Sequence, residues 1–180
     1  MLFAGNGPKY TLMANANHNT IADAIFGTLS YWAEWPLICI SLAWGILKNP
    51  RLGLWFGLCF LLEFGLIQGL KTGIGAHRPV MLFGDSLREL SGHPLLKWRS
   101  FPSGHTAAAF TALGFMAMQV NKSLFTGIFL LVSALCAYSR MYLGQHYLVD
   151  LAGGICVAMF ILIIFQLGRE KLTVLNNNLA

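Results

Sequence analysis

The chain alternates between long apolar stretches and short polar ones, and this pattern predicts most of its elements. The apolar stretches are residues 31–47, 52–70, 102–120, 124–138 and 147–167, and the polar segments KNPR, NKS and GREK each follow one of them. Roughly 20 residues of α-helix cross the hydrocarbon core of a bilayer, and flanking residues can extend a shorter stretch. The pattern therefore predicts an all-α membrane bundle with at least five transmembrane helices.

A further helix is expected ahead of these spans. Ile21, Ile25 and Leu29 recur at helical spacing, and Thr20 with Asp23 is typical of a capping box at a helix start. Such an amphipathic N-terminal segment either lies on the membrane surface or forms a sixth, tilted span. We therefore expect the 180-residue chain to be one integral-membrane domain of five to six transmembrane helices.

Composition agrees with a membrane protein. Hydrophobic residues make up 56% of the chain and charged residues 11%, against roughly 25% charged in a soluble domain. The net charge of +5 is not gathered into a basic run, so nucleic acid is not an expected partner. The four cysteines lie inside apolar stretches without metal-site spacing, which favours small core residues. Residues 1–19 lack an apolar core behind a basic start, so no cleavable signal peptide is expected.

Ionisable residues gather at the predicted ends of the spans. Lys71 ends the second span, His105 lies in the first turn of the third, Arg140 ends the fourth and His146 begins the fifth. Because successive spans run in opposite directions, the end of one and the start of the next share a membrane face. Ionisable groups beside apolar spans normally have a partner or a function. These residues are therefore expected to form one cluster at one face.

Three motifs contain this cluster: KTGIGAHRP at 71–79, FPSGHT at 101–106 and SRMYLGQHYLVD at 139–150. They resemble the three signatures of the type 2 phosphatidic acid phosphatase superfamily, and every defining position matches in the same order. The resemblance covers residues 50–165 well and residues 1–30 only loosely. It implies that His146 is a nucleophile that forms a phosphohistidine. It also implies that His105 protonates the leaving oxygen and later acts as the base that activates water.

The chemistry of phosphoryl transfer fits the other residues of the motifs, because it depends on positioning and on stabilising negative charge. Lys71, Arg78 and Arg140 supply fixed cations, and arginine offers a planar fork that matches phosphate oxygens. Such a site needs no metal, and no carboxylate cluster suited to a metal is present in the sequence. We therefore expect no cofactor.

Two local arrangements are also expected. Pro102 suits the first position of a helix, which would leave the amides of Ser103 and Gly104 free to face an anion. His146 and Asp150 stand four residues apart, on one helical face, so the carboxylate can hold the imidazole tautomer.

The substrate class follows from the resemblance rather than from the motifs, which grip only phosphate. A membrane lipid phosphate is expected, with undecaprenyl pyrophosphate or phosphatidylglycerophosphate favoured, and with lipid A and phosphatidic acid as alternatives. Apolar residues in the loop 80–101 are suited to guide a lipid from the headgroup region. Two other classes of protein are alternatives. A vanadium-dependent haloperoxidase has a similar anion site but is soluble and much larger. A non-catalytic lipid-binding or transport protein would be expected to have lost one of the two motif histidines.

The basic residues outside the motifs predict the orientation. The face opposite the cluster carries Lys48, Arg51, Lys122, Arg169 and Lys171, whereas the cluster face carries Arg88, Lys97 and Arg99, with Lys9 on either side. Cytoplasmic loops carry an excess of lysine and arginine. We therefore expect a bacterial inner-membrane protein whose site faces the periplasm. Three further residues lie outside the motifs: Glu63, expected to hydrogen-bond between helices, and His77 and His93, expected to be ordinary loop residues.

Overall fold

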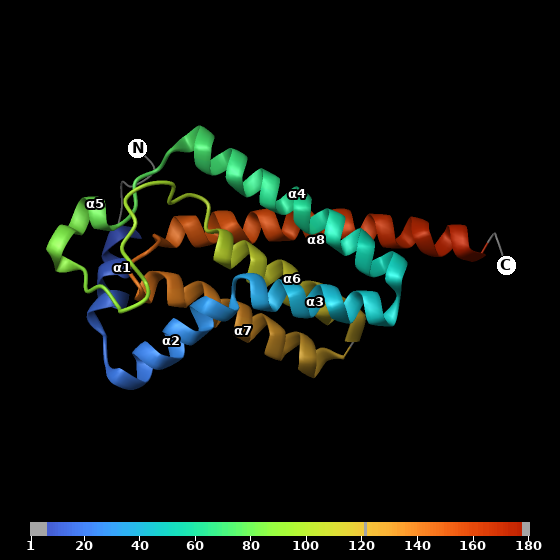
Figure 1. Cartoon of the computed structure of the whole chain (residues 1–180), viewed down its shortest axis with the longest axis horizontal. Coiled ribbons are helices and arrows are strands. Elements are labelled where there is room, and N and C mark those ends of the chain that lie inside the picture. The colour runs from blue at the N-terminus through green and yellow to red at the C-terminus, as the bar shows by residue number, and fades with distance from the viewer. Residues whose placement is uncertain (1–6, 121, 178–180) are drawn as a thin grey trace.

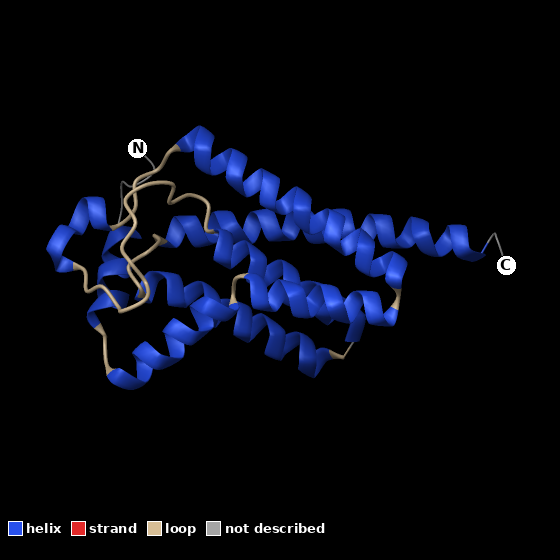
Figure 2. Cartoon of the chain, in the orientation of Figure 1, coloured by secondary structure: helices blue, strands red, loops and turns tan. Residues whose placement is uncertain are grey.

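A computed structural model describes residues 7–120 and 122–177, with side chains up to residue 171. Its helices run in the order α1 (Gly7–Ala16), α2 (Thr20–Trp32), α3 (Trp35–Lys48), α4 (Pro50–Ile74), α5 (Val80–Phe83), η1 (Gly84–Ser86), α6 (Gly104–Val120), α7 (Ser123–Tyr142) and α8 (Leu148–Asn177). Figures 1 and 2 show these helices as an elongated bundle, and the described part of the chain contains no strand. The predicted all-α fold is confirmed.

The five predicted spans correspond to α3, α4, α6, α7 and α8. Helices α4, α7 and α8 are long and apolar enough to cross a membrane, and α3 is a shorter apolar helix. Helix α6 has 17 residues, about 25 Å at 1.5 Å per residue. It packs against α3, α4, α7 and α8, and small residues such as Ala107, Ala109 and Ala112 are fully buried along it. Small side chains let helices approach closely within a membrane, which suits α6 to the centre of the bundle.

Aromatic packing holds the bundle together in its middle. The rings of Phe56 on α4 and Phe115 on α6 stack with centroids 4.0 Å apart. Phe165 on α8 meets both rings edge-on. All three rings are buried, so the contact joins three helices around one cluster. Offset-stacked and edge-to-face aromatic pairs are favourable beyond the area they bury.

The N-terminal helices α1 and α2 cover the end of the bundle at which the functional motifs lie (Figure 1). Helix α1 is not predicted by the sequence pattern. Thr11 donates a hydrogen bond from its side chain to the carbonyl of His146 (3.2 Å), and Asn15 donates one to the carbonyl of Tyr142 (2.9 Å). Helix α1 therefore supports the loop between α7 and α8 from outside the motifs.

The start of α2 differs from the predicted capping box. Asn19 is the N-cap, and its side chain accepts a hydrogen bond from the Ala22 amide (2.9 Å). The Asp23 carboxylate instead accepts hydrogen bonds from the hydroxyl of Tyr142 and contacts the ring of His18. The capping-box prediction at Thr20 was therefore wrong, because a tertiary contact with α7 uses the carboxylate that a local cap would need.

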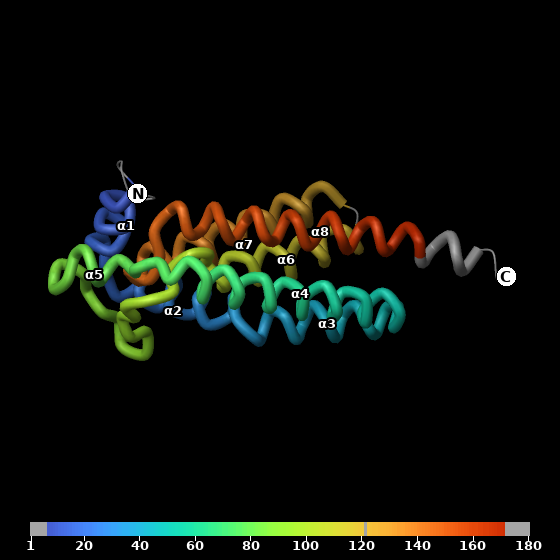
Figure 3. The backbone as a smooth tube through the Cα atoms, turned by 90° about the horizontal axis from the view of Figure 1, so that it is seen from above, coloured from blue at the N-terminus to red at the C-terminus, as the bar shows by residue number. Residues whose placement is uncertain are grey.

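The segment between α4 and α6 folds back over the motif end of the bundle, as the tube in Figure 3 shows. Two backbone hydrogen bonds join its beginning to its end, from Arg78 N to Lys97 O and from Ser100 N to Ala76 O, both 2.9 Å. Met81, Leu82, Leu96 and Trp98 remain exposed on it. The segment thus exposes apolar side chains at the same end of the bundle as the motifs.

Candidate active site

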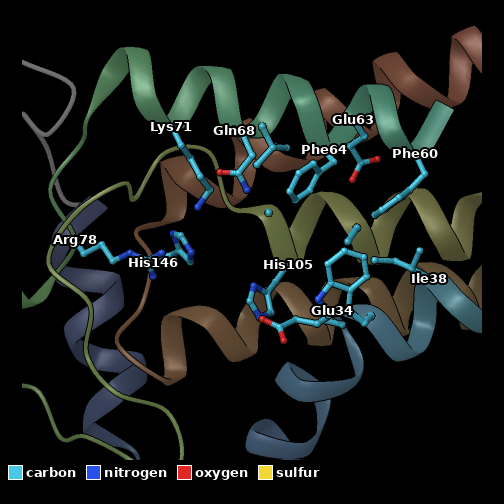
Figure 4. Close-up of a pocket in the computed structure, with 15 residues that line it drawn as sticks. Glu34, Ile38, Phe60, Glu63, Phe64, Gln68, Lys71, Arg78, His105 and His146 are labelled. Carbon is cyan, nitrogen blue, oxygen red and sulfur yellow. The ribbon is translucent and has the colours of Figure 1, made fainter. Parts of the chain in front are cut away.

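A cavity of about 230 Å³ lies where the end of α4 meets the start of α6. Five residues that the sequence predicts for the site line it: Lys71, Arg78, Gly104, His105 and His146. The other three predicted residues, Ser103, Arg140 and Asp150, are buried and do not line the cavity. Figure 4 shows Lys71, Arg78 and His146 gathered at one side, with His105 and Glu34 on the other. His77 and His93 lie in the loop and do not line it.

The cations Lys71 and Arg78 are fixed by backbone carbonyls of the covering loop. Lys71, in the last turn of α4, donates from Nζ to Arg99 O (3.1 Å). Arg78 donates from Nε to Trp98 O (3.0 Å) and from Nη1 to the side-chain oxygen of Gln145 (2.8 Å). Burial lowers the pKa of Arg78 to about 10, so this residue remains charged at neutral pH. No sequence pattern marks Gln145 as the partner of Arg78.

His146 lies in the loop before α8, with its ring almost completely buried. Its Nδ1 atom is 3.3 Å from Oδ2 of Asp150 and 3.5 Å from Oγ of Ser100. The same carboxyl oxygen accepts hydrogen bonds from Ser100 Oγ (2.5 Å) and from the Tyr147 amide (2.8 Å). His146 precedes the helix, so the prediction that both side chains share one helical face was wrong. The carboxylate reaches the ring because Asp150 lies in the first turn of α8.

Electrostatics keep the His146 ring neutral. Burial lowers its pKa well below the ordinary histidine value, and the nearby cations Arg78, Arg140 and Lys71 lower it further. Desolvation and positive neighbours both disfavour the imidazolium form. A neutral imidazole whose Nδ1 faces a carboxylate has its other nitrogen available as a nucleophile.

Arg140 lies behind the cavity wall. It lies in the last turn of α7, is 6% exposed and donates from Nη1 to the hydroxyl of Ser30 on α2. Its Nε atom is buried and has no hydrogen-bond partner in the described structure. Arg140 therefore adds positive charge to the site from a second layer, and its unpartnered Nε leaves a donor for an anion.

The start of α6 differs from the predicted arrangement. The helix begins at Gly104, two residues later than a first helical position at Pro102 requires. Ser103 takes the N-cap role, because its Oγ accepts a hydrogen bond from the Thr106 amide (3.4 Å). The Ser103 amide donates to the Asp150 carbonyl (2.9 Å), so it is not free for an anion as predicted. Gly104 does line the cavity.

Two glycines of α8 make possible the close contact between α8 and the residues just before α6. A Cβ at Gly154 would lie 2.6 Å from the Ser103 carbonyl oxygen, and one at Gly153 would lie 2.4 Å from the Phe101 ring. Both distances are shorter than side chains tolerate. The absence of side chains at these positions allows α8 to dock against the second motif, which brings Asp150 and Ser103 together.

Glu34 is a site residue that the sequence analysis missed. It lies between α2 and α3 and lines the cavity, and its Oε1 is 2.7 Å from Nε2 of His105. This hydrogen bond lowers the pKa of the Glu34 carboxyl. No sequence signal marks Glu34, because it lies 71 residues before His105 (105 − 34 = 71) and in no motif.

Taken together, the charges suit an anion. Lys71 and Arg78 line the cavity, Arg140 lies behind its wall and a neutral histidine faces it, so a phosphate group would offset the mutual repulsion of the three cations. Within the residues whose side chains are described, no three His, Cys, Asp or Glu side chains are grouped to hold a metal.

Comparison with known proteins agrees with this geometry. A family model described as the PAP2 superfamily matches residues 52–173. The structure of LpxE from Aquifex aeolicus superposes with a TM-score of 0.80 at 26% identity, covering 91% of this chain and 96% of that chain. That of the first transmembrane PAP2 type phosphatidylglycerolphosphate phosphatase from Bacillus subtilis superposes with a TM-score of 0.72 at 21% identity, covering 91% and 84%. No curated protein matches the chain at a significant level.

The fold and the cavity define a membrane-spanning helix bundle with a cavity lined by Lys71 and Arg78 at one end. The chain belongs to the PAP2 superfamily of membrane lipid phosphatases. The predicted family is thereby confirmed, and the chain is an integral membrane protein.

Proposed function

We propose that this protein is a lipid phosphatase that hydrolyses a phosphate monoester or pyrophosphate through a phosphohistidine intermediate. The observation that carries the proposal is the position of His146, whose Nδ1 faces Asp150 while its ring lines the cavity with Lys71, Arg78 and His105. This arrangement supplies a nucleophile, a proton donor and fixed positive charge around one space.

In the first step, Nε2 of His146 attacks phosphorus while the bond from phosphorus to the leaving oxygen breaks. Asp150 accepts the Nδ1 proton in a hydrogen bond and stabilises the positive charge that develops on the ring. Lys71 and Arg78 hold the phosphoryl oxygens, and Arg140 adds positive charge from behind the cavity wall, as phosphoryl transfer requires. His105 donates a proton to the leaving oxygen, and the dephosphorylated lipid departs.

In the second step, water attacks the phosphohistidine. His105, now neutral, accepts a proton from this water, and the bond between phosphorus and Nε2 breaks. Phosphate leaves, and both histidines return to their starting protonation states. No step in this cycle draws on a metal ion, since the fixed cations carry the charge stabilisation.

The proposed location is a bacterial inner membrane with the site facing the periplasm. The turn between α3 and α4, the turn between α6 and α7, and the end of α8 lie at the end of the bundle opposite the site (Figure 1). These segments carry the basic residues Lys48, Arg51, Lys122, Arg169 and Lys171. Helix α1 adds Lys9 to the basic residues at the site end. The opposite end still carries more basic residues outside the motifs, as expected of a cytoplasmic face.

Phosphate release in detergent tests the function. We expect turnover of at least one among undecaprenyl pyrophosphate, phosphatidylglycerophosphate, phosphatidic acid and lipid A in the presence of EDTA. Vanadate should inhibit the reaction, because it mimics the transferred phosphoryl group. An acid-labile, base-stable phosphoprotein should accumulate on rapid quenching. Hydrolysis of none of these lipids would refute the proposal, and loss of turnover on chelation, restored by magnesium, would refute the metal-free mechanism.

The non-enzymatic alternative, a lipid-binding or transport protein with this fold, predicts binding of the same lipids without phosphate release. Retention of both His146 and His105 at the cavity disfavours it.

A further inference from the structure

Glu63 is a buried acid that the proposed reaction does not use. It lies in the middle of α4, is 2% exposed, and lines the same cavity as Lys71. In Figure 4 its carboxyl group points from α4 into the space beside Phe60 and Phe64. Its Oε2 atom is buried and has no hydrogen-bond partner in the described structure. The hydrogen bond between helices that the sequence predicts is therefore not completed at this oxygen.

The surroundings of Glu63 do not supply the missing partner. Thr111 on α6 lies close enough to interact with the carboxyl, yet the Thr111 hydroxyl also lacks a normal hydrogen bond. No described cation forms an ion pair with Glu63. An isolated carboxylate in an apolar site is very costly, so Glu63 is present as the neutral acid, which carries one O–H donor.

The cavity connects this donor to the phosphate site. Glu63 lies eight residues before Lys71 (71 − 63 = 8), which is about 12 Å along the helix axis. Between them the cavity is lined by the polar side chain of Gln68 together with apolar residues such as Phe64 and Ile67 (Figure 4). A lipid whose phosphate lies beside Lys71 would place its next atoms along this part of the cavity. The group that reaches Glu63 would then be about 12 Å from the phosphate.

We propose that Glu63 is a specificity subsite that donates a hydrogen bond to the ester carbonyl of a diacyl glycerophospholipid substrate. The inference rests on the proposed phosphatase function and narrows its substrate. It requires a terminal phosphate separated from the ester carbonyls by a polar spacer such as a glycerol phosphate, as in phosphatidylglycerophosphate. In phosphatidic acid, and in an acylated sugar phosphate, the first carbonyl is only a few bonds from the phosphate. A polyisoprenyl pyrophosphate offers only hydrocarbon at this position, which would leave the acid unpaired.

Matched ester and ether lipids test the proposal. An ether-linked phosphatidylglycerophosphate differs from the ester-linked lipid mainly in lacking the two carbonyl oxygens. We expect the wild-type protein to favour the ester over the ether in kcat/KM by roughly tenfold, the worth of one net hydrogen bond. Glu63→Leu should reduce this ratio to about one, whereas Glu63→Gln should retain much of it, because the amide also donates. Leu61→Ala, at an exposed position of the same helix, should leave the ratio unchanged.

Two further arms separate this inference from the phosphatase proposal. The ester and ether forms of phosphatidic acid should show a ratio that Glu63→Leu does not change, because their carbonyls lie too close to the phosphate. In addition, binding of both phosphatidylglycerophosphate forms to His146→Ala protein measures the preference without turnover. That preference should persist in His146→Ala and disappear in the double variant with Glu63→Leu.

The outcomes are distinct. Absence of phosphate release from every lipid would refute the phosphatase, and the binding ratio would still report on Glu63. An ester-to-ether ratio near one in the wild-type protein would overturn the subsite. An equal loss in Glu63→Leu on all lipids and on a water-soluble aryl phosphate would also overturn it, since that result indicates a packing role.

Discussion

The Nε2 atom of His105 in α6 lies 2.7 Å from the Oε1 atom of Glu34, which lies in the turn between α2 and α3. The Glu34 side chain is 47% exposed, and that of His105 is 21% exposed, so the pair lies at the edge of the cavity. The hydrogen bond between Glu34 and His105 lowers the pKa of the Glu34 carboxyl below the ordinary value of 4.5. The carboxylate is therefore charged at every pH above that value, and the pair is lost only as the pH falls through the lowered pKa.

Glu34→Gln should change the pH dependence of the reaction. A carboxylate beside an imidazole favours its protonated form, which is the form that donates to a leaving oxygen. Without that charge, the alkaline limb of kcat for a lipid monophosphate, which reports the enzyme–substrate complex with its bound phosphate anion, should move to lower pH. We expect a loss of several-fold at pH 8 and a smaller one at pH 6. An equal loss at both pH values, with no movement of the limb, would show that Glu34 only packs against the ring.

The two histidines should respond differently to substitution. His146→Ala should abolish turnover of every substrate, because it removes the proposed nucleophile. His105→Ala should slow phosphoenzyme formation from phosphatidic acid by roughly 10²–10⁴-fold, the usual contribution of a general acid. An activated aryl phosphate has a leaving oxygen that needs little protonation, so its first step should be much less affected.

Rapid-quench, single-turnover measurements are needed to see this difference. Hydrolysis of the phosphohistidine requires His105 for every substrate, so steady-state rates would hide the effect. Equal losses in the first step for both leaving groups would indicate that His105 binds phosphate instead of protonating the leaving oxygen.

The ring of His146 should stay neutral well below pH 6.5. Burial and nearby cations lower its pKa, so the neutral form persists as the pH falls past the ordinary histidine value. Arg78→Gln removes one of those cations and should raise the pKa toward that value. NMR titration of ¹⁵N-labelled histidines in detergent measures the pKa of His146 in the wild-type protein and in Arg78→Gln. The His146 signal is assigned from the spectrum of His146→Gln. Protonation of the wild-type ring at or above pH 6.5 would contradict this electrostatic account.

Gly154→Ala should disturb the site without removing any polar group. A Cβ at this position would lie 2.6 Å from the Ser103 carbonyl oxygen, so α8 and the start of α6 must separate. Overpacking of this kind typically costs about 1–3 kcal/mol. We expect a lower melting temperature and a larger loss of activity than the stability change alone produces. Gly69→Ala is the matched control, because nothing lies within 4 Å of its added Cβ; a similar loss in both variants would contradict the prediction.

Much of the fold was predictable because membrane spans leave a strong sequence signal. A helix in lipid must satisfy its backbone hydrogen bonds internally and present apolar side chains, so five apolar stretches predicted five helices. Helix α1 was missed because it lies outside the long apolar stretches. Its role comes from single contacts, such as that of Thr11 with the His146 carbonyl.

The sequence by itself determined the motif residues and the face at which they meet, because antiparallel spans bring alternate ends together. It did not determine how those residues are held. Glu34 beside His105, Gln145 beside Arg78 and Ser100 beside Asp150 each join segments that are far apart or irregular in the chain. Such pairs leave no periodic pattern, since each depends on one side chain reaching one atom. Only the packing of the helices, which the contact of Gly154 with Ser103 illustrates, brings these atoms within bonding distance.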